Sequence, residues 1–493
     1  MESSLYIAVD LGAGSGRVFL AGVDPGELLL EEIQRFQYPP TESDGHLRWD
    51  FGRIFGEIKI GLRRSGKRAA ELGRRIQSLG VDTWGVDYGL IDEAGELIAD
   101  PVCYRDDRTR NAMEKVFRLV SRDTIFEKTG IQFQNFNTIY QLSAEGDDLK
   151  KASKLLLLPD LINYFLTGKA VAEYTNATTM QMVNAATKTW DADLRQKLGL
   201  SSEIFQGIVE PGTDLGELKQ EVKVETGIGN IRVIVPATHD TASAVAGAPI
   251  AGDEAYISSG TWSLIGVENM HAIINDEAAR QNFTNEGGAY GTFRFLKNVM
   301  GLWIFESCRR EWIGRGLAAD YDELLSGIEK IDGSSGFIFP DDGRFLNPAS
   351  MLGAIETQMR ETGQQFDSDP VAISKVIFDS LAFRYASVLR SIESLTGRKL
   401  KRVQILGGGG KNRYLNQMTA DASGLTVRAG LTEATVVGNV LVQAVSAGRF
   451  SSLSEARQHV AANIKLTEFV PQRSPELTLA EARYLEIEGR FCS

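Results

Sequence analysis

Two turns rich in glycine and hydroxyl residues carry the clearest chemical signal in this sequence. The first is Leu11–Gly16, directly after Asp10, and the second is Ser258–Thr261. Each turn lies between two apolar segments and therefore predicts a β-hairpin. Because glycine lacks a Cβ atom, backbone N–H groups in such a turn can converge on a phosphate, and hydroxyl groups add donors. The repeated hairpin predicts two halves that bind one nucleotide.

The glycine spacing excludes the commoner phosphate motifs. The sequence contains no G-x-x-x-x-G-K-[ST] run, and the glycines of both turns lie inside a hairpin instead of opening a helix. A third glycine run, Gly407–Gly410, follows an apolar strand and precedes a helical pattern. Backbone at such a helix start can lie flat against adenine and ribose. A flexible linker is the alternative, which the flanking strand and helix oppose.

Asp240 is the first candidate for a catalytic base. It follows the apolar strand Ile231–Val235 and a turn, and a helical pattern starts at Thr241. Taken alone, this spacing favours a helix N-cap, in which the side chain accepts hydrogen bonds from free N–H groups. The alternative is a general base that takes a proton from a substrate hydroxyl.

Asp10 is the candidate metal ligand, because it ends a buried strand beside the first turn. A turn-forming Asp, bonded to the amides of Gly12 and Ala13, is the alternative, and both roles are compatible. Phosphates at this hairpin would crowd negative charge around Asp10, which favours Mg²⁺ bound mainly through water. Arg17 either offsets the same charge or is an ordinary exposed strand residue.

The elements that must position these residues alternate between strands and helices. Apolar spacing predicts a helix over 49–72 and a buried strand over 76–82, followed by a hairpin that pairs 89–92 with 97–99. In the second half, it predicts a long buried helix over 373–392, ended by Gly397, and a strand over 403–406. Both halves are therefore expected to be mixed α/β.

Length and composition limit the class of protein. At 493 residues the chain exceeds what one core usually supports, which predicts two domains, 1–248 and 249–493, joined in a turn-rich segment. The net charge of −12 opposes extended binding to nucleic acid or to an anionic membrane. Three scattered cysteines, with neither a signal peptide nor an apolar span, predict a cytoplasmic location.

Three motifs in fixed order resemble the superfamily that contains the sugar kinases, actin and the heat-shock chaperones. They are the Asp-x-Gly that starts at Asp10, the Gly260-Thr261 turn and the run Gly407–Gly410. The segment Leu406–Asp421 is similar to the FGGY carbohydrate kinases, and the likeness covers essentially the whole chain. The resemblance implies two actin-like (ribonuclease H-like) α/β domains with a catalytic cleft between them, the nucleotide on the C-terminal side and the sugar on the N-terminal side.

Several segments point to one branch of this family. That branch transfers the γ-phosphoryl group of Mg·ATP to the 1-hydroxyl of L-rhamnulose, giving L-rhamnulose 1-phosphate and ADP in rhamnose catabolism. The resemblance thus implies ATP and Mg²⁺ as cofactors, a small ketose as partner, neither nucleic acid nor membrane, and a monomer or small homo-oligomer. The segments are Val81–Tyr88, Tyr104–Thr109, Gly130–Phe133, Asn137–Gln141, Tyr174–Thr179, His239–Ala244 and Leu296–Trp303.

The resemblance also implies roles for single residues, with Asp240 as the catalytic base and Asp10 at the metal. The sugar is expected to contact Gly85, His239, Asp240, Thr241 and Asn298. The nucleotide is expected to contact Ala13, Gly14, Ser15, Gly16, Arg17, Gly260, Thr261, Glu306, Gly407, Gly408, Gly409 and Asn412.

Two other functions remain open at this point. The chain could phosphorylate another ketose, such as L-fuculose or a xylulose, because the sugar side is interpreted only by resemblance. The same scaffold could also serve as a nucleotide-dependent sugar-sensing regulator. Trp84 is interpreted as a core residue or a sugar platform. The charged loop 104–109 is either a polar site element or a solvated, salt-bridged turn.

Overall fold

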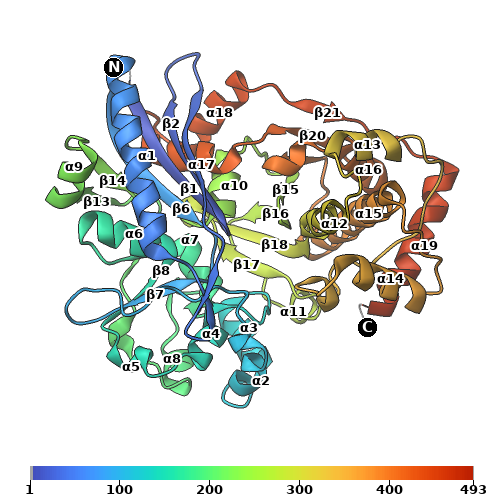
Figure 1. Ribbon diagram of the computed structural model, residues 1–493, viewed down its shortest axis with the longest axis horizontal. Coiled ribbons are helices and arrows are strands. Elements are labelled where there is room, and N and C mark those ends of the chain that lie inside the picture. Colours follow the sequence, from blue (N-terminus) through green and yellow to red (C-terminus); the bar gives the residue numbers. More distant parts are fainter. Residues whose placement is uncertain (1–3, 492–493) are drawn as a thin grey trace. The chain divides into compact units, whose positions relative to one another are not determined.

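The computed structural model describes residues 4–491 (Figure 1), which pack into two compact units. The first unit contains the chain up to Pro249 together with 268–295 and 433–464, and the second contains 250–267, 296–432 and the chain from Lys465 onward. The first passage between the units thus falls beside the predicted boundary at 248/249. Two later segments return to the first unit, so neither unit is continuous in sequence.

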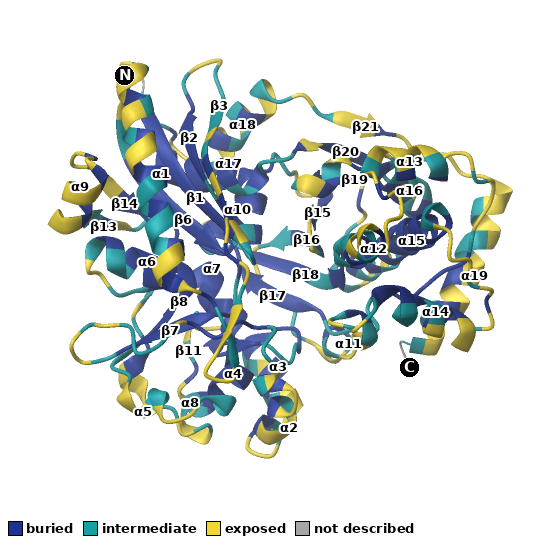
Figure 2. Ribbon diagram, viewed as in Figure 1, coloured by how far each residue is buried: buried dark blue, intermediate teal, exposed yellow. Residues whose placement is uncertain are grey.

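A six-stranded mixed sheet forms the centre of the first unit. β1 pairs with β2 and β2 with β3 in antiparallel fashion, whereas β6 runs parallel to both β1 and β14. Figure 2 shows β1 and β6 as buried, as expected for strands covered on both faces. In sheet order the strands are β13 (Asp214–Glu217), β14 (Arg232–Ile234), β6 (Arg75–Thr83), β1 (Ser4–Gly12), β2 (Ser15–Gly22) and β3 (Leu29–Gln37).

Helix α1 (Phe51–Glu71) packs on this sheet through Phe51, Ile54, Ile58 and Leu62, and therefore confirms the predicted helix. Asp50 caps it by accepting from Arg53 N–H at 2.8 Å. Helices α10 (Asp240–Gly247) and α17 (Ala434–Ser446) contact the same sheet and pack closely on each other.

The two helices α10 and α17 cross at glycines. A Cβ atom on Gly247 would lie 2.5 Å from the carbonyl oxygen of Ala434, and one on Gly438 would collide with the carbonyl oxygen of Ser243. Only glycine allows this backbone-to-backbone contact. The crossing fixes the position of α10, whose first residue is Asp240.

The second unit repeats the strand order of the first. β15 pairs with β16 antiparallel and with β19 parallel, and β19 is parallel to β20. This second sheet has seven strands, and six of them, in the order β21-β20-β19-β15-β16-β18, match β13-β14-β6-β1-β2-β3; the seventh is β17, beside β18. The predicted duplication therefore extends beyond the hairpins to six strands of each sheet. The strands are β15 (Glu254–Ser259), β16 (Trp262–Asn269), β18 (Phe293–Met300), β19 (Arg402–Leu406), β20 (Thr426–Leu431) and β21 (Thr467–Phe469).

The long helix of the second unit is α15 (Pro370–Thr396), which confirms the predicted buried helix. Asp369 caps its start, and Gly397 ends it in the left-handed conformation with φ 67°. β19 confirms the strand that was predicted to follow it. The other helices of this unit are α12 (Trp303–Gly314), α13 (Tyr321–Ile328), α14 (Met351–Glu361), α16 (Arg413–Ser423) and α19 (Pro475–Phe491).

The predicted hairpin over 89–99 forms only in part. Ile98 N–H donates to Leu90 O at 2.9 Å and Leu97 makes a bridge to Ile91, but 97–99 do not form a regular strand. The regular strand partner of β7 (Tyr88–Ile91) is β8 (Lys154–Leu157), whose residues 155–157 are buried. The first unit is completed by β4 (Thr41–Ser43), β5 (His46–Arg48), β9 (Ala172–Glu173), β10 (Val183–Asn184), β11 (Thr189–Trp190), β12 (Ile208–Val209), β17 (Thr284–Gly287), α2 (Ala112–Phe117), α3 (Arg122–Thr129), α4 (Thr138–Ala144), α5 (Asp148–Lys151), α6 (Leu158–Thr167), α7 (Tyr174–Ala177), α8 (Ala192–Lys197), α9 (Gln220–Thr226), α11 (Asp276–Arg280) and α18 (Leu453–Asn463).

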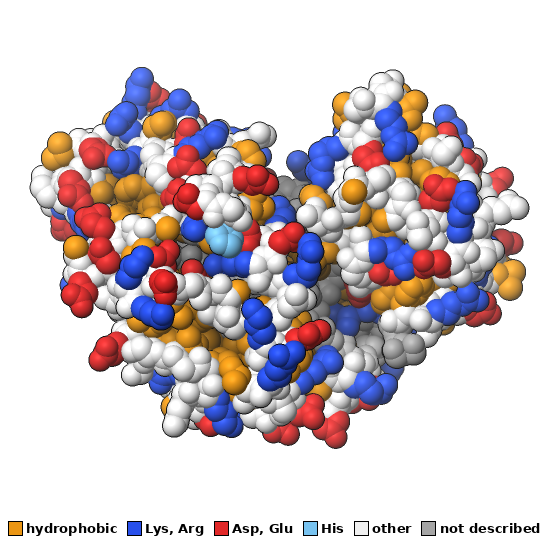
Figure 3. Space-filling view, turned by 60° about the horizontal axis from the view of Figure 1, so that its bottom comes forward, with side chains coloured by type: hydrophobic (Ala, Val, Ile, Leu, Met, Phe, Trp, Pro, Cys, Tyr) orange, Lys and Arg blue, Asp and Glu red, His pale blue; other side chains and the backbone are white. Residues whose placement is uncertain are grey.

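Charged side chains of both signs are interspersed on the face drawn in Figure 3. The acidic excess of the sequence is thus mixed with Lys and Arg on this face rather than gathered in one block. Among residues 4–491, no helix is both long and apolar enough to cross a membrane.

Candidate active site

Three carboxylates gather at the carboxyl ends of the parallel strands in the first unit. Asp10 and Asp82 are register partners on β1 and β6, and a bridge between Thr83 and His239 sets the start of α10 beside them. Asp240 is the first residue of that helix. Since ligands bind at the carboxyl edge of such sheets, this edge is the candidate site.

Asp10 and Arg17 form an ion pair across the first hairpin, and Arg17 Nη1 also donates to Glu433 Oε2 at 2.5 Å. Burial opposes the charge of Arg17, yet the two carboxylates outweigh it and raise its pKa. Arg17 is therefore not an ordinary exposed strand residue, because its charge is paired with Asp10 and Glu433, while its contact with phosphate stays a prediction. Glu433 lies more than four hundred residues away in sequence, and spacing alone could not identify it.

The first turn is held by its own backbone and by Tyr38. Gly14 N–H donates to Gly12 O at 2.7 Å, and the Tyr38 hydroxyl donates to Gly12 O at 2.6 Å. Gly14 has φ 129°, where other residues are strained, and no atom outside the turn lies within 4 Å of the position of a Cβ. Ala13 is half-buried and Ser15 is exposed, so the turn presents backbone and a hydroxyl to its surroundings.

Asp82 is a member of the site to which the sequence analysis assigned no role. Its side chain is fully buried, and its Oδ2 accepts from Asn439 Nδ2 at 2.5 Å. Burial, together with the charge of Asp10, holds the pKa of Asp82 well above its usual range. Its place beside Asp10 on neighbouring parallel strands is a signal that could have identified it.

Asp240 is not the N-cap of α10, because that position belongs to His239. Its Oδ1 accepts from Thr241 N–H at 2.5 Å and from the Thr241 hydroxyl at 3.1 Å, and 31% of the side chain is exposed. Burial raises the pKa of Asp240 above its ordinary value and the charge of Asp10 adds to this, whereas a protonated His239 would oppose it. A carboxylate with a raised pKa and an accessible edge is suited to accept a proton.

Glu173 supports the turn that precedes Asp240. Its buried carboxylate accepts from the N–H and hydroxyl of Thr175, at 2.8 and 2.6 Å, and from the N–H and hydroxyl of Thr238, at 3.0 and 2.6 Å. Thr175 in turn accepts from His239 N–H at 3.3 Å. Glu173 therefore joins the segment Tyr174–Thr179, quoted above for its resemblance, to the start of α10.

Gly85 lies in a strained turn against Thr179. A Cβ atom on Gly85 would lie 2.9 Å from Thr179 Oγ1, and the next residue, Val86, has φ 71°. A β-branched residue in the left-handed region is unfavourable and needs external support. That support comes from Thr179 Oγ1, which accepts from Val86 N–H at 3.1 Å, and from the Thr138 hydroxyl, which donates to Val86 O at 2.7 Å.

Thr179→Val is expected to destabilise the protein by about 1–3 kcal/mol, because the substitution keeps the shape of the side chain but leaves the buried Val86 N–H without an acceptor. The resemblance implies a sugar contact at Gly85, which lies in the same turn, so the KM for the sugar should also rise. Urea denaturation together with steady-state kinetics measures both effects. Thr179→Ser keeps the hydroxyl and should stay close to wild type. A Ser variant that loses as much stability as the Val variant and shows the same rise in KM contradicts this role of the hydroxyl.

The aromatic and charged residues after β6 are mostly engaged in internal contacts. Trp84 is buried, packs on Trp49 with ring centroids 4.7 Å apart, and donates to Asp87 Oδ2 at 2.9 Å, which identifies it as a core residue. Burial raises the pKa of Asp87 to about 6, although the bonds from Trp84 and Trp49 lower it. This network of buried side chains supports the turn that contains Gly85.

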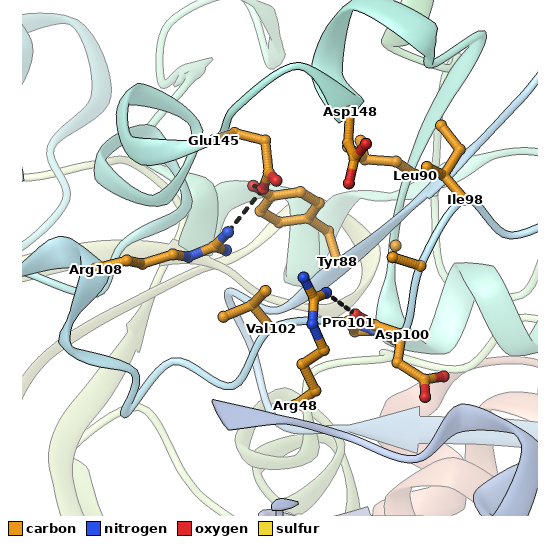
Figure 4. Close-up of a pocket in the computed structure, with 12 residues that line it drawn as sticks. Arg48, Tyr88, Leu90, Ile98, Asp100, Pro101, Val102, Arg108, Glu145 and Asp148 are labelled. Carbon is orange, nitrogen blue, oxygen red and sulfur yellow. Dashed lines mark hydrogen bonds and ion pairs between the residues drawn. The ribbon is translucent and has the colours of Figure 1, made fainter. Parts of the chain in front are cut away.

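Arg108 of the charged loop lies beside the small pocket shown in Figure 4. Its guanidinium donates to Glu145 Oε2 at 2.8 Å and to Gln141 Oε1 at 2.9 Å, and the Tyr88 hydroxyl donates to the same glutamate at 2.5 Å. Asp106 is likewise engaged, because it accepts from Leu47 N–H at 2.7 Å. Arg108 and Asp106 are thus bonded to residues outside the loop, and the buried Arg108 side chain does not fit a solvated turn.

In the second unit, the turn of the second hairpin is fixed by the start of α12. Gly260 O accepts from Leu302 N–H at 3.0 Å, and Thr261 O accepts from Gly301 N–H and Trp303 N–H, both at 3.2 Å. A Cβ atom on Gly301 would lie 2.7 Å from Trp262 C. These contacts fix the backbone of Gly301, Leu302 and Trp303, and Gly260 and Thr261 remain exposed.

The glycine run follows β19 and lies against the same hairpin. Gly407 has φ 82°, and a Cβ atom on Gly409 would collide with Ser259 Oγ. Gly408 is exposed and has open space around it. Asn412 is fully buried and caps α16 by accepting from Leu415 N–H at 2.9 Å. Its structural role is thus plain, and a nucleotide contact stays a prediction.

The remaining predicted residues also lie in the second unit. Glu306, in the first turn of α12, forms an ion pair with Arg309 at 2.9 Å. Asn298 lies half-buried on β18. The second unit therefore carries the predicted nucleotide residues other than those of the first turn, together with Asn298.

The site suits Mg²⁺, which keeps water and phosphate oxygens among its ligands, better than a metal ion whose ligands all come from the protein. Among residues 4–491, no group of three His, Cys, Asp or Glu side chains could hold an ion. Asp10 and Asp82 offer two adjacent carboxylates, and Mg²⁺ in phosphoryl-transfer sites needs only one or two besides water and phosphate oxygens.

Comparisons with solved structures define the class of fold. The chain is similar to the gluconate kinase from Lactobacillus acidophilus, with a TM-score of 0.83 at 16% identity, over 100% of this chain and 99% of that one. It is also similar to the Plasmodium falciparum glycerol kinase with ADP, with a TM-score of 0.77 at 14% identity, over 99% and 98% of the two chains. The fold is thus the two-domain, actin-like α/β fold of sugar kinases, as predicted.

Family models and curated relatives identify the family. Residues 5–247 match the N-terminal domain, and residues 255–447 the C-terminal domain, of the FGGY family of carbohydrate kinases. The chain is 43% identical to the rhamnulokinase of Oceanobacillus iheyensis over 456 residues, which cover 92% of this chain and 95% of the relative. It is 42% identical to the rhamnulokinase of Bacteroides thetaiotaomicron over 489 residues, 98% and 99% of the two chains. The chain belongs to the FGGY family of carbohydrate kinases.

Proposed function

We propose that this protein transfers the γ-phosphoryl group of Mg·ATP to the 1-hydroxyl of L-rhamnulose, giving L-rhamnulose 1-phosphate and ADP. The observation that carries the proposal is the partly exposed carboxylate of Asp240, which lies beside Asp10. The chain that holds it is at least 42% identical to two rhamnulokinases over nearly its whole length. The segment with Gly85 and the turn with His239 would form the sugar side. L-Fuculose and the xyluloses are the competing substrates.

The reaction needs little covalent work from the protein, because phosphoryl transfer depends mainly on positioning and on charge stabilisation. Asp240 would accept the proton of the sugar hydroxyl as that oxygen attacks the γ-phosphorus. His239 and Thr241 would orient the sugar. Backbone N–H groups of the two hairpin turns, with Arg17 and Thr261, would hold the phosphates.

Asp10, with Asp82 beside it, would hold Mg²⁺ together with water and phosphate oxygens. When bound, the ion supplies neutralisation of the charge on the transferring phosphoryl group. Arg17 pairs with Asp10 in the structure and would share that carboxylate with the metal.

Asp10→Asn is expected to weaken the dependence of the rate on Mg²⁺ far more than the binding of the sugar, because the variant loses the charge that attracts the cation. Rates measured across a Mg²⁺ titration, beside sugar affinity from calorimetry, separate the two effects. The fold should persist in circular dichroism. An unchanged Mg²⁺ dependence in the folded variant would remove Asp10 from the metal site.

The proposed substrate is tested by ADP release with a panel of ketoses. L-Rhamnulose should give the highest kcat/KM among L-rhamnulose, L-fuculose and the xyluloses. A clearly higher value for another ketose overturns the substrate and leaves the kinase class intact. Sugar binding without sugar-dependent ADP release would instead favour the regulator.

A further inference from the structure

Three buried residues of the first unit form a chain that ends at His239. Arg294 Nη2 lies 3.0 Å from His239 Nδ1 and 3.0 Å from Glu286 Oε2. Arg294 has no exposed side-chain area, and the side chains of Glu286 and His239 are only 7% and 10% exposed. Arg294 Nε donates to Gly287 O at 2.9 Å, so its guanidinium is held in orientation.

The chemistry of arginine decides how His239 carries its proton. A guanidinium group has only N–H donors and stays charged in proteins. The nitrogen of His239 that faces it must therefore be the acceptor. Glu286 Oε2 lies farther from Nδ1, at 3.4 Å, and the shorter contact belongs to Arg294. A neutral imidazole that accepts at Nδ1 carries its proton on Nε2.

The Nε2–H of His239 faces the candidate catalytic base. His239 Nε2 lies 3.5 Å from Asp240 Oδ1, and His239 N–H is fixed by Thr175. This separation is longer than a normal hydrogen bond, which leaves Nε2–H available to a substrate oxygen placed next to Asp240. A ring with the proton on Nδ1 would present a lone pair to Asp240 instead, and the two would repel.

We propose that Arg294 and Glu286 are positioning residues that hold His239 as the neutral Nε2–H tautomer, so that it donates a hydrogen bond to the substrate hydroxyl beside Asp240. Glu286 neutralises the buried guanidinium, and Arg294 sets the tautomer. The tautomer follows from the buried contacts alone, whereas its use in catalysis rests on the proposed function. Neither residue appears among the predicted site residues, because β17 and β18 meet α10 only in three dimensions.

Nitrogen-15 NMR of the full chain tests the tautomer directly. The sequence has only four histidines, so selective ¹⁵N-histidine labelling gives few signals, and His239→Gln identifies the one of interest. His239 should show a pyridine-like Nδ1 and a protonated Nε2. A protonated Nδ1, or a doubly protonated ring at a pH where the enzyme is active, overturns the proposal whatever the substrate is.

The double variant Glu286→Gln/Arg294→Met tests whether Arg294 sets the tautomer of His239. Both charges are removed together, so neither is left buried and unpaired. We expect the pyridine-like Nδ1 signal to be lost or averaged and kcat to fall on the order of 10–100-fold, the size typical of partners that orient a functional histidine. The single variant Glu286→Gln retains the Arg294 contact and should keep the tautomer. Unchanged Nδ1 signal and kcat in the double variant overturn the role of Arg294.

If the double variant does not fold, the wild-type spectrum decides the tautomer by itself. Wild-type spectra with the expected tautomer but no turnover of any ketose would refute the proposed function and not the tautomer.

Discussion

Asp240→Asn is expected to lower kcat by roughly 10²–10⁴-fold, because the amide cannot take the proton of the sugar hydroxyl. Thermal stability should change little. Asp240 is not the helix N-cap, and an amide oxygen can still accept from Thr241 N–H at the start of α10. Steady-state kinetics and a melting curve on the same preparation measure the two effects.

The pH profile provides the control for this substitution. Because the pKa of Asp240 is raised, the wild-type kcat should decline as pH falls through that pKa, where the base becomes protonated. The Asn variant should lack this acid limb. A variant with near wild-type kcat would place the base elsewhere, and one that loses its stability while each folded molecule stays active would make Asp240 a structural residue.

Gly438→Ala is expected to destabilise the protein by about 3 kcal/mol, at the upper end of the range for overpacking. The new methyl group would collide with the carbonyl oxygen of Ser243, and a backbone atom cannot move aside as a side chain can. Relief requires α10 and α17 to separate, which also displaces Asp240. Calorimetry should show a lower melting temperature, and kcat should fall in the molecules that remain folded.

Gly56→Ala is the matched control. Gly56 lies inside α1, and nothing outside the helix lies within 4 Å of the position of its Cβ. Alanine in a helix interior is favoured over glycine by about 0.5–1 kcal/mol, so this variant should be as stable as wild type or more so. Equal destabilisation of both variants would show that the α10–α17 crossing has no special sensitivity.

The elements of the fold were predictable where the apolar pattern is long and local. The helices over Phe51–Glu71 and Pro370–Thr396 and the strands β6 and β19 follow from such patterns. The hairpin over 89–99 forms only in part, and the regular strand partner of β7 lies more than sixty residues further along the chain. Long-range pairing of this kind leaves no local signal, since a strand shows which face is buried and not what it pairs with.

The site was predictable to the extent that its residues lie in motifs. Asp10, Asp240 and the glycine turns are identified by their own neighbours in sequence. Asp82 required knowledge that β1 and β6 are adjacent and parallel, and the partners of His239 lie on elements far from it in sequence. Buried polar groups that support a site are recognised by their contacts, which only the folded chain supplies.

The return of residues 433–464 to the first unit has a consequence for synthesis on the ribosome. Gln443 of α17 donates to Ile7 O of β1 at 3.0 Å, and Asn439 donates to Asp82. The first sheet therefore lacks helix α17, which packs on it, until almost the entire chain has left the exit tunnel. A chain whose sheet is completed late exposes apolar strands during synthesis, and such strands are prone to aggregation and to chaperone binding. A gene fragment that stops near Pro249 should accordingly yield an insoluble product, although it encodes all three carboxylates of the site.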